Sequence, residues 1–196
     1  MNFKEYFSAN PEQYDKKLNK GVLGWIRKQE REAILKFLKP VKGEEILDIP
    51  CGTGYYADYI VEKGASVYGV DISPEMLRVF KQKGYNGHCG DLKTFCLKKK
   101  FDKVLSAGGF EFCLEHKKIV KNLLVHAKSG APIILLVTRK CILGRLFQVY
   151  HLLKSNTKIA IFSEKEIRET CSQSEVNTIE THPCGIFGLV VRIVKK

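Results

Sequence analysis

Residues 44–54 read Glu-Glu-Ile-Leu-Asp-Ile-Pro-Cys-Gly-Thr-Gly, and this stretch decides the fold. Its apolar run predicts a buried strand that ends in Asp48. Gly52 and Gly54 then turn the backbone into a helix that begins near Tyr55. Because glycine has no Cβ, such a turn admits a ligand against the bare main chain. The stretch therefore predicts a ligand site directly after the first strand of a parallel sheet.

Two further strand-like runs end in carboxylates. Residues 66–70 lead into Asp71, and residues 86–90 lead into Asp91. A carboxylate at the strand tip next to a glycine turn is placed to bind the hydroxyls of a ribose, which predicts that role for Asp71. Asp91 is placed to accept from an adenine amine. Since the carboxyl ends of parallel strands meet at one edge of a sheet, these groups predict a nucleoside-binding crevice.

The residues of the glycine turn are compatible with more than one nucleoside cofactor. The glycine turn, read from Gly52 to Ala57, also fits the dinucleotide pattern G-x-G-x-x-G/A, which would mean a nicotinamide cofactor. Asp48 favours a ligand with an amino group instead, because a dinucleotide site usually has a neutral strand tip there. Two strand-like runs close the chain, residues 176–181 and 186–194, joined by a Pro-Cys-Gly turn.

With these residues the sequence resembles the class I S-adenosylmethionine-dependent methyltransferases, specifically their large small-molecule group. Residues 47–54 match the first motif LDxxCGTG, residues 70–73 read VDIS, and residues 90–91 read GD. The resemblance extends over residues 44–196. It implies an α/β, Rossmann-like doubly wound sheet of seven strands in the order 3-2-1-4-5-7-6, with the last strand antiparallel, and S-adenosyl-L-methionine as the cofactor.

The resemblance also implies which residues contact each part of the cofactor. The expected set is Asp48 for the amino group; Pro50, Cys51, Gly52, Thr53 and Gly54 for the methionine portion; Asp71 for the ribose; Ile72, Met76, Asp91 and Leu92 for the adenine; Ala107 and Gly108 for the sulfur; and Tyr14 as a cap. No metal site is expected, and none of the cysteines forms a C-x-x-C pair.

The catalytic base is not assigned by the sequence. Relatives often carry histidine where Phe112 stands, so a base from that position is absent. Glu111, His116, Tyr150 and His151 are the candidates to take a proton from a hydroxyl acceptor. No D/N-P-P-Y/F follows the fourth strand, which disfavours methylation of adenine amines in nucleic acid.

The alternation of strand and helix signals predicts one domain spanning all 196 residues. Its expected parts are an N-terminal cap, a helix, the cofactor-binding core, a lid insertion, and a C-terminal helix and hairpin: residues 1–24, 25–39, 44–138, 139–162 and 163–196 respectively. The cap and the lid both mix apolar and charged residues. We expect them to cover the crevice.

Composition limits the partners. The net charge of +12 suits nucleic acid, an anionic membrane surface or an acidic substrate. No apolar run approaches the roughly 20 residues that span a bilayer. The first residues lack the apolar region of a secretory signal, and the seven cysteines are irregularly spaced, so free thiols in a cytoplasm are expected.

These observations favour a methyltransferase that acts on a small or lipid-like acceptor, at oxygen rather than nitrogen. The apolar content of the cap and the lid favours a hydrophobic acceptor, such as a quinone, tetrapyrrole or lipid precursor. Two alternatives remain. The basic surface would suit an RNA-directed methyltransferase, and the unassigned base leaves room for a non-catalytic S-adenosylmethionine-binding protein.

Overall fold

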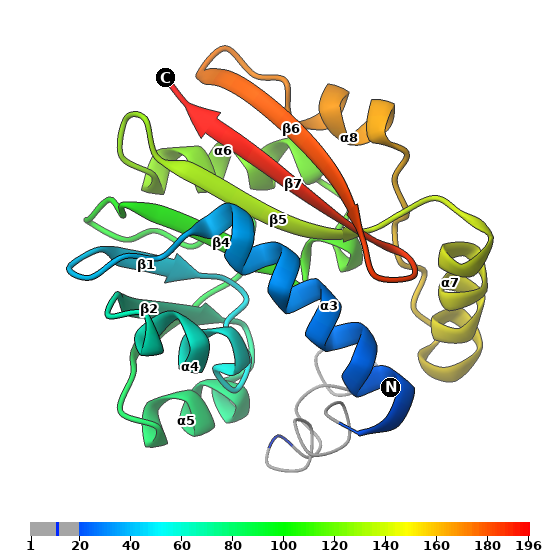
Figure 1. Ribbon diagram of the computed structural model, residues 1–196, viewed down its shortest axis with the longest axis horizontal. Coiled ribbons are helices and arrows are strands. Elements are labelled where there is room, and N and C mark those ends of the chain that lie inside the picture. Colours follow the sequence, from blue (N-terminus) through cyan, green and yellow to red (C-terminus); the bar gives the residue numbers. More distant parts are fainter. Residues whose placement is uncertain (1–10, 12–19) are drawn as a thin grey trace.

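Seven strands form one mixed sheet: β1 (Glu45–Asp48), β2 (Ser66–Asp71), β3 (Asn86–Cys89), β4 (Lys103–Ala107), β5 (Pro132–Thr138), β6 (Val176–Cys184) and β7 (Gly188–Lys195). Their order in the computed structural model is β3-β2-β1-β4-β5-β7-β6 (Figure 1). The first five strands pair in parallel, and β7 is antiparallel to both β5 and β6. The predicted fold class and strand order are confirmed. The structure describes Pro11 and residues 20–196.

Helices cover both faces of this sheet. The helices are α3 (Gly21–Leu38), α4 (Tyr55–Glu62), α5 (Pro74–Gln82), α6 (His116–His126), α7 (Ile142–Ser155) and α8 (Glu164–Cys171), with a 3-10 turn, η1 (Phe110–Phe112). Apolar residues of α3, α4 and α5 pack in one core cluster, and those of α6 and α8 pack in another. In Figure 1, α3 crosses the sheet over β5 and β7, and α7 stands at the side of the molecule.

The interior strand β5 shows why the sheet needs two covers. Ile133 and Leu135 belong to one core cluster, whereas Ile134 and Leu136 belong to the other. Successive side chains of a strand point to opposite faces, so a strand that is apolar throughout must be covered on both sides. The apolar run of residues 132–138 is therefore a strand buried on both faces.

Two helices begin at side-chain caps. The Ser73 hydroxyl accepts from the Met76 backbone N–H at 3.2 Å, with Pro74 in the first turn of α5. At α8, Ser163 and Glu166 form a complete capping box. Each such cap satisfies N–H groups that have no partner inside the helix.

The N-terminal boundary was predicted wrongly. The helix expected over residues 25–39 begins at Gly21, so residues 21–24 of the predicted cap belong to α3. Lys20, at the position before α3, makes no side-chain cap hydrogen bond. The sequence therefore carried no start signal there. The rest of the predicted cap lies outside the described residues, apart from Pro11 and Lys20.

The C-terminal hairpin also differs from the expected turn. Pro183 and Cys184 belong to β6, where they pair with Leu189 and Gly188 of β7, so the turn is residues 185–187. Proline lacks an N–H and is tolerated in a strand at the edge of a sheet, which is where β6 lies. A Pro-Cys-Gly run that looks like a turn in sequence is thus mostly strand. Among the described helices, none has the length and apolar character needed to cross a bilayer.

Candidate cofactor site

The sheet brings the predicted acidic groups to one edge. β1 lies between β2 and β4, and all three run in parallel, so their carboxyl ends are neighbours. Asp48 ends β1, Asp71 ends β2 and Ala107 ends β4. Asp48 and Asp71 are close enough for the charge of Asp71 to raise the pKa of Asp48. The sequence prediction that these tips share one crevice edge agrees with this arrangement.

The glycine turn follows Asp48 directly. Gly52 and Gly54 have φ values of 51° and 87°, which lie in the region that L side chains rarely adopt. Gly54 donates its N–H to the Cys51 carbonyl at 2.9 Å, and its own carbonyl accepts from Asp58 at 3.1 Å to start α4. Thr53 between the glycines is buried. The positive φ angles are the local reason that glycine is needed at both positions.

Asp71 holds this turn in place. Its Oδ2 accepts from the Gly52 backbone N–H and its Oδ1 from the Ser73 backbone N–H, both at 2.8 Å. The side chain is only 6% exposed, and burial raises its pKa while these hydrogen bonds partly offset the rise. A carboxylate oxygen has a second lone pair. Asp71 can therefore hold the turn and still accept from a ligand hydroxyl.

Asp48 has no partner of its own. Its side chain is fully buried, and neither Oδ1 nor Oδ2 finds a hydrogen-bond donor among the described residues. Burial raises the pKa of Asp48 well above its ordinary value, with the charge of Asp71 as the second cause. Burying an unpaired carboxylate costs on the order of several kcal/mol, because the ion loses its hydration. A cationic amino group at this position would relieve that cost, so the site fits an amino-acid-like ligand.

Pro50 and Cys51 shape the turn from behind. A Cβ built on Gly109 would lie 2.4 Å from the Pro50 Cγ, and one on Gly69 would lie 2.7 Å from the Cys51 Sγ. Both neighbours must therefore be glycine for the turn to pack this closely. Burial raises the pKa of the Cys51 thiol well above its usual range, so this thiol stays protonated in a packing role.

The tip of β4 offers bare backbone. Ala107 is buried, and Gly108 has a φ of 77° with no atom within 4 Å of the place where a Cβ would stand. A ligand can therefore approach the main chain at Gly108. Its expected contact with the cofactor sulfur stays a prediction.

The adenine side is less well defined. Ile72 is 37% exposed, whereas Met76 and Leu92 are buried. Asp91 Oδ1 accepts from the Lys93 backbone N–H at 2.7 Å, which closes a local turn. The roles of these four residues toward an adenine stay predictions, and Tyr14 lies outside the described residues.

Comparison with known proteins identifies the domain and the fold. Residues 47–135 match the family model for a methyltransferase domain, and this range contains the glycine turn and the tips of β1, β2 and β4. The seven-stranded sheet has the fold of class I S-adenosylmethionine-dependent methyltransferases. The magnesium protoporphyrin IX methyltransferase structure from Synechocystis PCC 6803 is similar, with a TM-score of 0.74 at 18% identity over 98% of this chain and 97% of that one. That likeness shows the fold.

Two relatives found by sequence match part of this chain. The chain is 34% identical to demethylmenaquinone methyltransferase of Tropheryma whipplei (strain Twist) over 104 residues, which is 50% of this chain and 41% of that protein. It is 24% identical to malonyl-[acyl-carrier protein] O-methyltransferase of Priestia megaterium over 152 residues, which is 70% of this chain and 55% of the relative. The chain spans about half the length of these relatives.

The four candidates for the catalytic base in this methyltransferase domain differ in their burial and contacts. His116 packs between the rings of Phe110 and Phe162, with centroids at 4.8 and 5.0 Å, and burial lowers its pKa. The Tyr150 hydroxyl, on a half-exposed side chain, accepts from Lys154 at 2.6 Å. Glu111 and His151 are the more deeply buried candidates, at 7% and 8% exposure.

An aromatic cluster joins η1 to α7 and to the β6–β7 turn. The Phe147 ring stacks on Phe187 at 4.7 Å and meets His151 at 4.6 Å, and His151 meets Phe112 at 5.5 Å between centroids. These residues come from α7, η1 and the β6–β7 turn. Sequence reasoning missed Phe187, because nothing local marks a phenylalanine in a hairpin turn as the neighbour of a helix.

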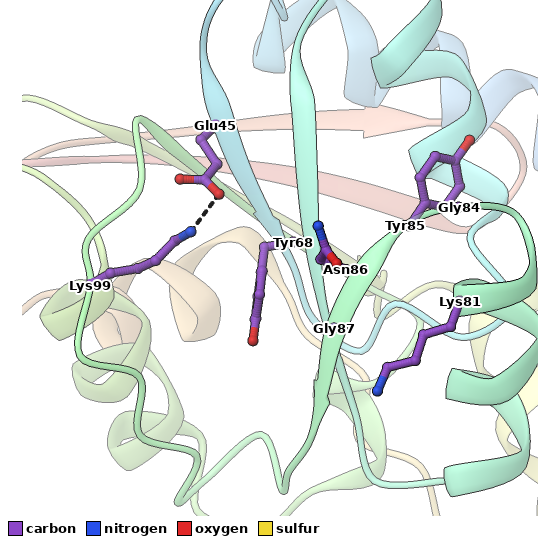
Figure 2. Close-up of a pocket in the computed structure, with 8 residues that line it drawn as sticks. All are labelled: Glu45, Tyr68, Lys81, Gly84, Tyr85, Asn86, Gly87 and Lys99. Atoms are coloured by element: carbon purple, nitrogen blue, oxygen red, sulfur yellow. Dashed lines mark hydrogen bonds and ion pairs between the residues drawn. The ribbon is translucent and has the colours of Figure 1, made fainter.

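A separate hollow lies at the other edge of the sheet. Figure 2 shows its lining, including Tyr68, Lys81 and the ion pair between Glu45 and Lys99. It has a volume of about 510 Å³ and lies at the amino ends of β1 and β3. None of the residues predicted to contact the cofactor lines it.

Metal and disulfide chemistry find no support in this methyltransferase domain. Within the part of the chain that the structure describes, no group of three His, Cys, Asp or Glu side chains is placed to hold a metal ion. All seven cysteines are free.

Proposed function

We propose that the protein is a cytoplasmic S-adenosylmethionine-dependent methyltransferase that methylates a hydroxyl of a small, hydrophobic or lipid-like acceptor. One observation supports the assignment of the cofactor: the carboxylate of Asp48 is buried beside a glycine turn and has no hydrogen-bond partner among the described residues. The free thiols support a reducing compartment.

The chain's residues would divide the work of binding. Asp48 would pair with the amino group of the cofactor, Asp71 would accept from the ribose, and Gly108 would offer bare backbone. When bound, S-adenosylmethionine supplies an activated methyl group. The protein then has mainly to orient the acceptor and exclude water. The positions of these residues at adjoining strand tips support that division.

The surroundings of η1 support an apolar acceptor. Phe112, which follows the β4 tip closely in the chain, belongs to an aromatic cluster with Phe147, His151 and Phe187. Helix α7 also exposes large apolar side chains: Ile142, Leu143, Leu146, Val149, Tyr150, Leu152 and Leu153. We assign residues 139–162, which contain α7, as a lid over the acceptor. Exposed apolar surface of this kind marks a contact with a ligand, a lipid surface or a protein.

The relatives support the same acceptor class. The Priestia relative is an O-methyltransferase of malonyl-[acyl-carrier protein], and the Tropheryma relative acts on demethylmenaquinone by name. Residues 139–162 hold five Lys or Arg residues and no Asp or Glu. Basic charge next to exposed apolar residues suits an anionic membrane surface, where a lipid-like acceptor would be found.

Calorimetry tests the cofactor. We expect S-adenosylmethionine and S-adenosylhomocysteine to bind and NAD to give no heat. Asp48→Asn serves as the site control. Tight binding of NAD with no response to S-adenosylmethionine would overturn the proposal.

A labelling experiment tests the acceptor. The protein is incubated with methyl-labelled S-adenosylmethionine and cell extract, and the product is separated into lipid, small aqueous and RNA fractions. We expect label in the organic-soluble fraction, and none with Asp48→Asn. RNase-sensitive label would favour the RNA-directed alternative that the net charge of +12 supports. Cofactor binding without label in any fraction would favour a non-catalytic binding protein.

A further inference from the structure

Glu111 lies where three parts of the site meet. It belongs to η1, directly after the β4 tip, and the preceding Gly109 packs against Pro50 of the glycine turn. The Glu111 carbonyl accepts from the Ala160 backbone N–H at 2.7 Å, which ties η1 to the segment we assign as the lid. The backbone of Glu111 is thus fixed between the cofactor turn and the acceptor cover.

The Glu111 side chain is buried and incompletely paired. The residue is 7% exposed, and its Oε2 finds no hydrogen-bond partner among the described residues. Burying a carboxylate oxygen without a donor is unfavourable. Packing of the fold alone gives no reason to keep a carboxylate here, whereas a proton-transfer role does.

Glu30 of α3 lies near Glu111. Burial raises the pKa of Glu111, and the charge of Glu30 adds to this rise. Glu30 Oε1 lies 3.4 Å from the place where a Cβ on Gly188 would stand, so α3 directs this side chain toward the β6–β7 hairpin. A residue of α3 therefore influences a residue of η1 that is far from it in the chain.

Burial raises the pKa of Glu111 to about 7, with Glu30 as the charged neighbour that adds to it, and it raises the pKa of Glu30 to about 7 against the opposing charge of Arg27. Besides burial, the charge of Glu30 raises the pKa of Tyr56 and of Cys184, and the charge of Glu111 adds to the raised pKa of Cys113. Asp48 also raises the pKa of Tyr56, and Arg139 lowers that of Cys184. A carboxylate that titrates near neutral pH suits proton transfer.

We propose that Glu111 receives the proton of the acceptor's hydroxyl group during methyl transfer, and that Glu30 is a positioning residue for Glu111. This inference rests on the proposed function. It assigns the base that the sequence left among four candidates, and adds Glu30, which the sequence did not single out.

The proton and electron balance is complete without a further reactant. Glu111, as the carboxylate, takes the hydroxyl proton, and the electron pair of that O–H bond stays on the acceptor oxygen and forms the new bond to the methyl carbon. The pair of the broken S–C bond stays on sulfur as a neutral thioether. Glu111 then gives its proton to water.

The test compares two cofactor forms that differ in charge at sulfur. Affinities for cationic S-adenosylmethionine and neutral S-adenosylhomocysteine are measured by calorimetry from pH 5.5 to 8.5. A carboxylate beside the sulfonium favours the cation only when ionised, so the preference should rise by about tenfold with pH in the natural protein. Asp48 binds the amino group common to both compounds, so its titration cancels in the ratio.

Variants make the test specific. In Glu111→Gln the ratio of the affinities for the two compounds should not change with pH. In Glu30→Gln the pH at the midpoint of the rise in this ratio should be lower than in the natural protein. Glu115→Gln, an exposed residue of the same type nearby that pairs with Lys93 and Lys118, should keep the rise. A flat ratio in the natural protein, or a rise that survives in Glu111→Gln, overturns the inference. Failure of both compounds to bind counts against the proposed function instead.

Labelling in cell extract supplies the second readout. Glu111→Gln should transfer methyl about 100-fold more slowly than the natural protein, the usual effect of losing a general base. Glu115→Gln should match the natural protein. Equal rates for Glu111→Gln and the natural protein overturn the inference, whereas no transfer by the natural protein refutes the proposed function.

Discussion

The backbone N–H of Gly52 donates to Asp71 Oδ2 at 2.8 Å and so ties the glycine turn after β1 to the tip of β2. The other oxygen of the same carboxylate accepts from Ser73, which starts α5. One buried side chain thereby fixes two backbone segments of the proposed cofactor site. The geometry of the turn and the affinity for the cofactor should depend on the same carboxylate.

Replacing Asp71 with Asn should weaken binding of S-adenosylmethionine by tenfold or more, roughly the effect of losing one or two hydrogen bonds to a charged group. Asp102→Asn is the matched control, because Asp102 also accepts from a backbone N–H (Glu45, 2.9 Å) and from Lys128, at the opposite end of β1. Both variants should lose stability in urea unfolding. Equal cofactor affinities in the two variants would contradict the role of Asp71.

Asp48→Asn should separate stability from binding. Removing a buried, unpaired charge should raise the free energy of unfolding of the cofactor-free protein at pH 8 by about 1 to 3 kcal/mol. The same change should weaken S-adenosylmethionine binding at least tenfold, since the partner of the amino group is lost. Urea unfolding and calorimetry on one preparation measure both effects. A variant that is less stable and binds normally would show that Asp48 has a structural role only.

Gly108→Ala tests whether the cofactor needs bare backbone at the β4 tip. Gly130 is the matched control, because its φ of 75° is close to the 77° of Gly108 and neither has an atom within 4 Å of a built Cβ. Each alanine should cost about 1 kcal/mol of stability from the strained backbone. Only Gly108→Ala should also reduce cofactor affinity. If both variants bind like the natural protein, Gly108 is not in contact with the cofactor.

Glu111→Gln should change how stability depends on pH. The folded-state pKa of about 7 lies above the usual 4.5, so the folded protein holds this proton more tightly than the unfolded chain does. That contribution to stability is present at low pH and is lost as the pH rises from about 4.5 through 7. Between pH 4 and pH 8 the variant should therefore lose about 3 kcal/mol less stability than the natural protein. If the free energy of unfolding changes by the same amount between pH 4 and pH 8 in the variant and in the natural protein, the raised pKa of Glu111 is contradicted.

The cofactor edge could be predicted because its signals are local. A strand that ends in Asp48, a turn that needs glycine at 52 and 54, and a second strand that ends in Asp71 are each visible within a few residues of sequence. Parallel strands place such tips together whatever covers the sheet. The caps at Ser73 and Ser163 were predictable for the same reason, since capping depends on residues three positions apart.

The acceptor side was decided by tertiary structure. Glu30 and Glu111 are 81 residues apart in the chain and meet only because α3 packs over β5 and β7 while η1 packs on Pro50. No periodicity or spacing encodes that approach. The start of α3 at Gly21 and the extension of β6 through Pro183 likewise depend on packing and on the edge position of the strand. The sequence by itself determined the order of the strands' signals and the glycine turn after β1, because those depend on local backbone geometry. The tertiary structure alone decided which distant carboxylates and rings share one environment, because burial and mutual charge arise only when the helices dock.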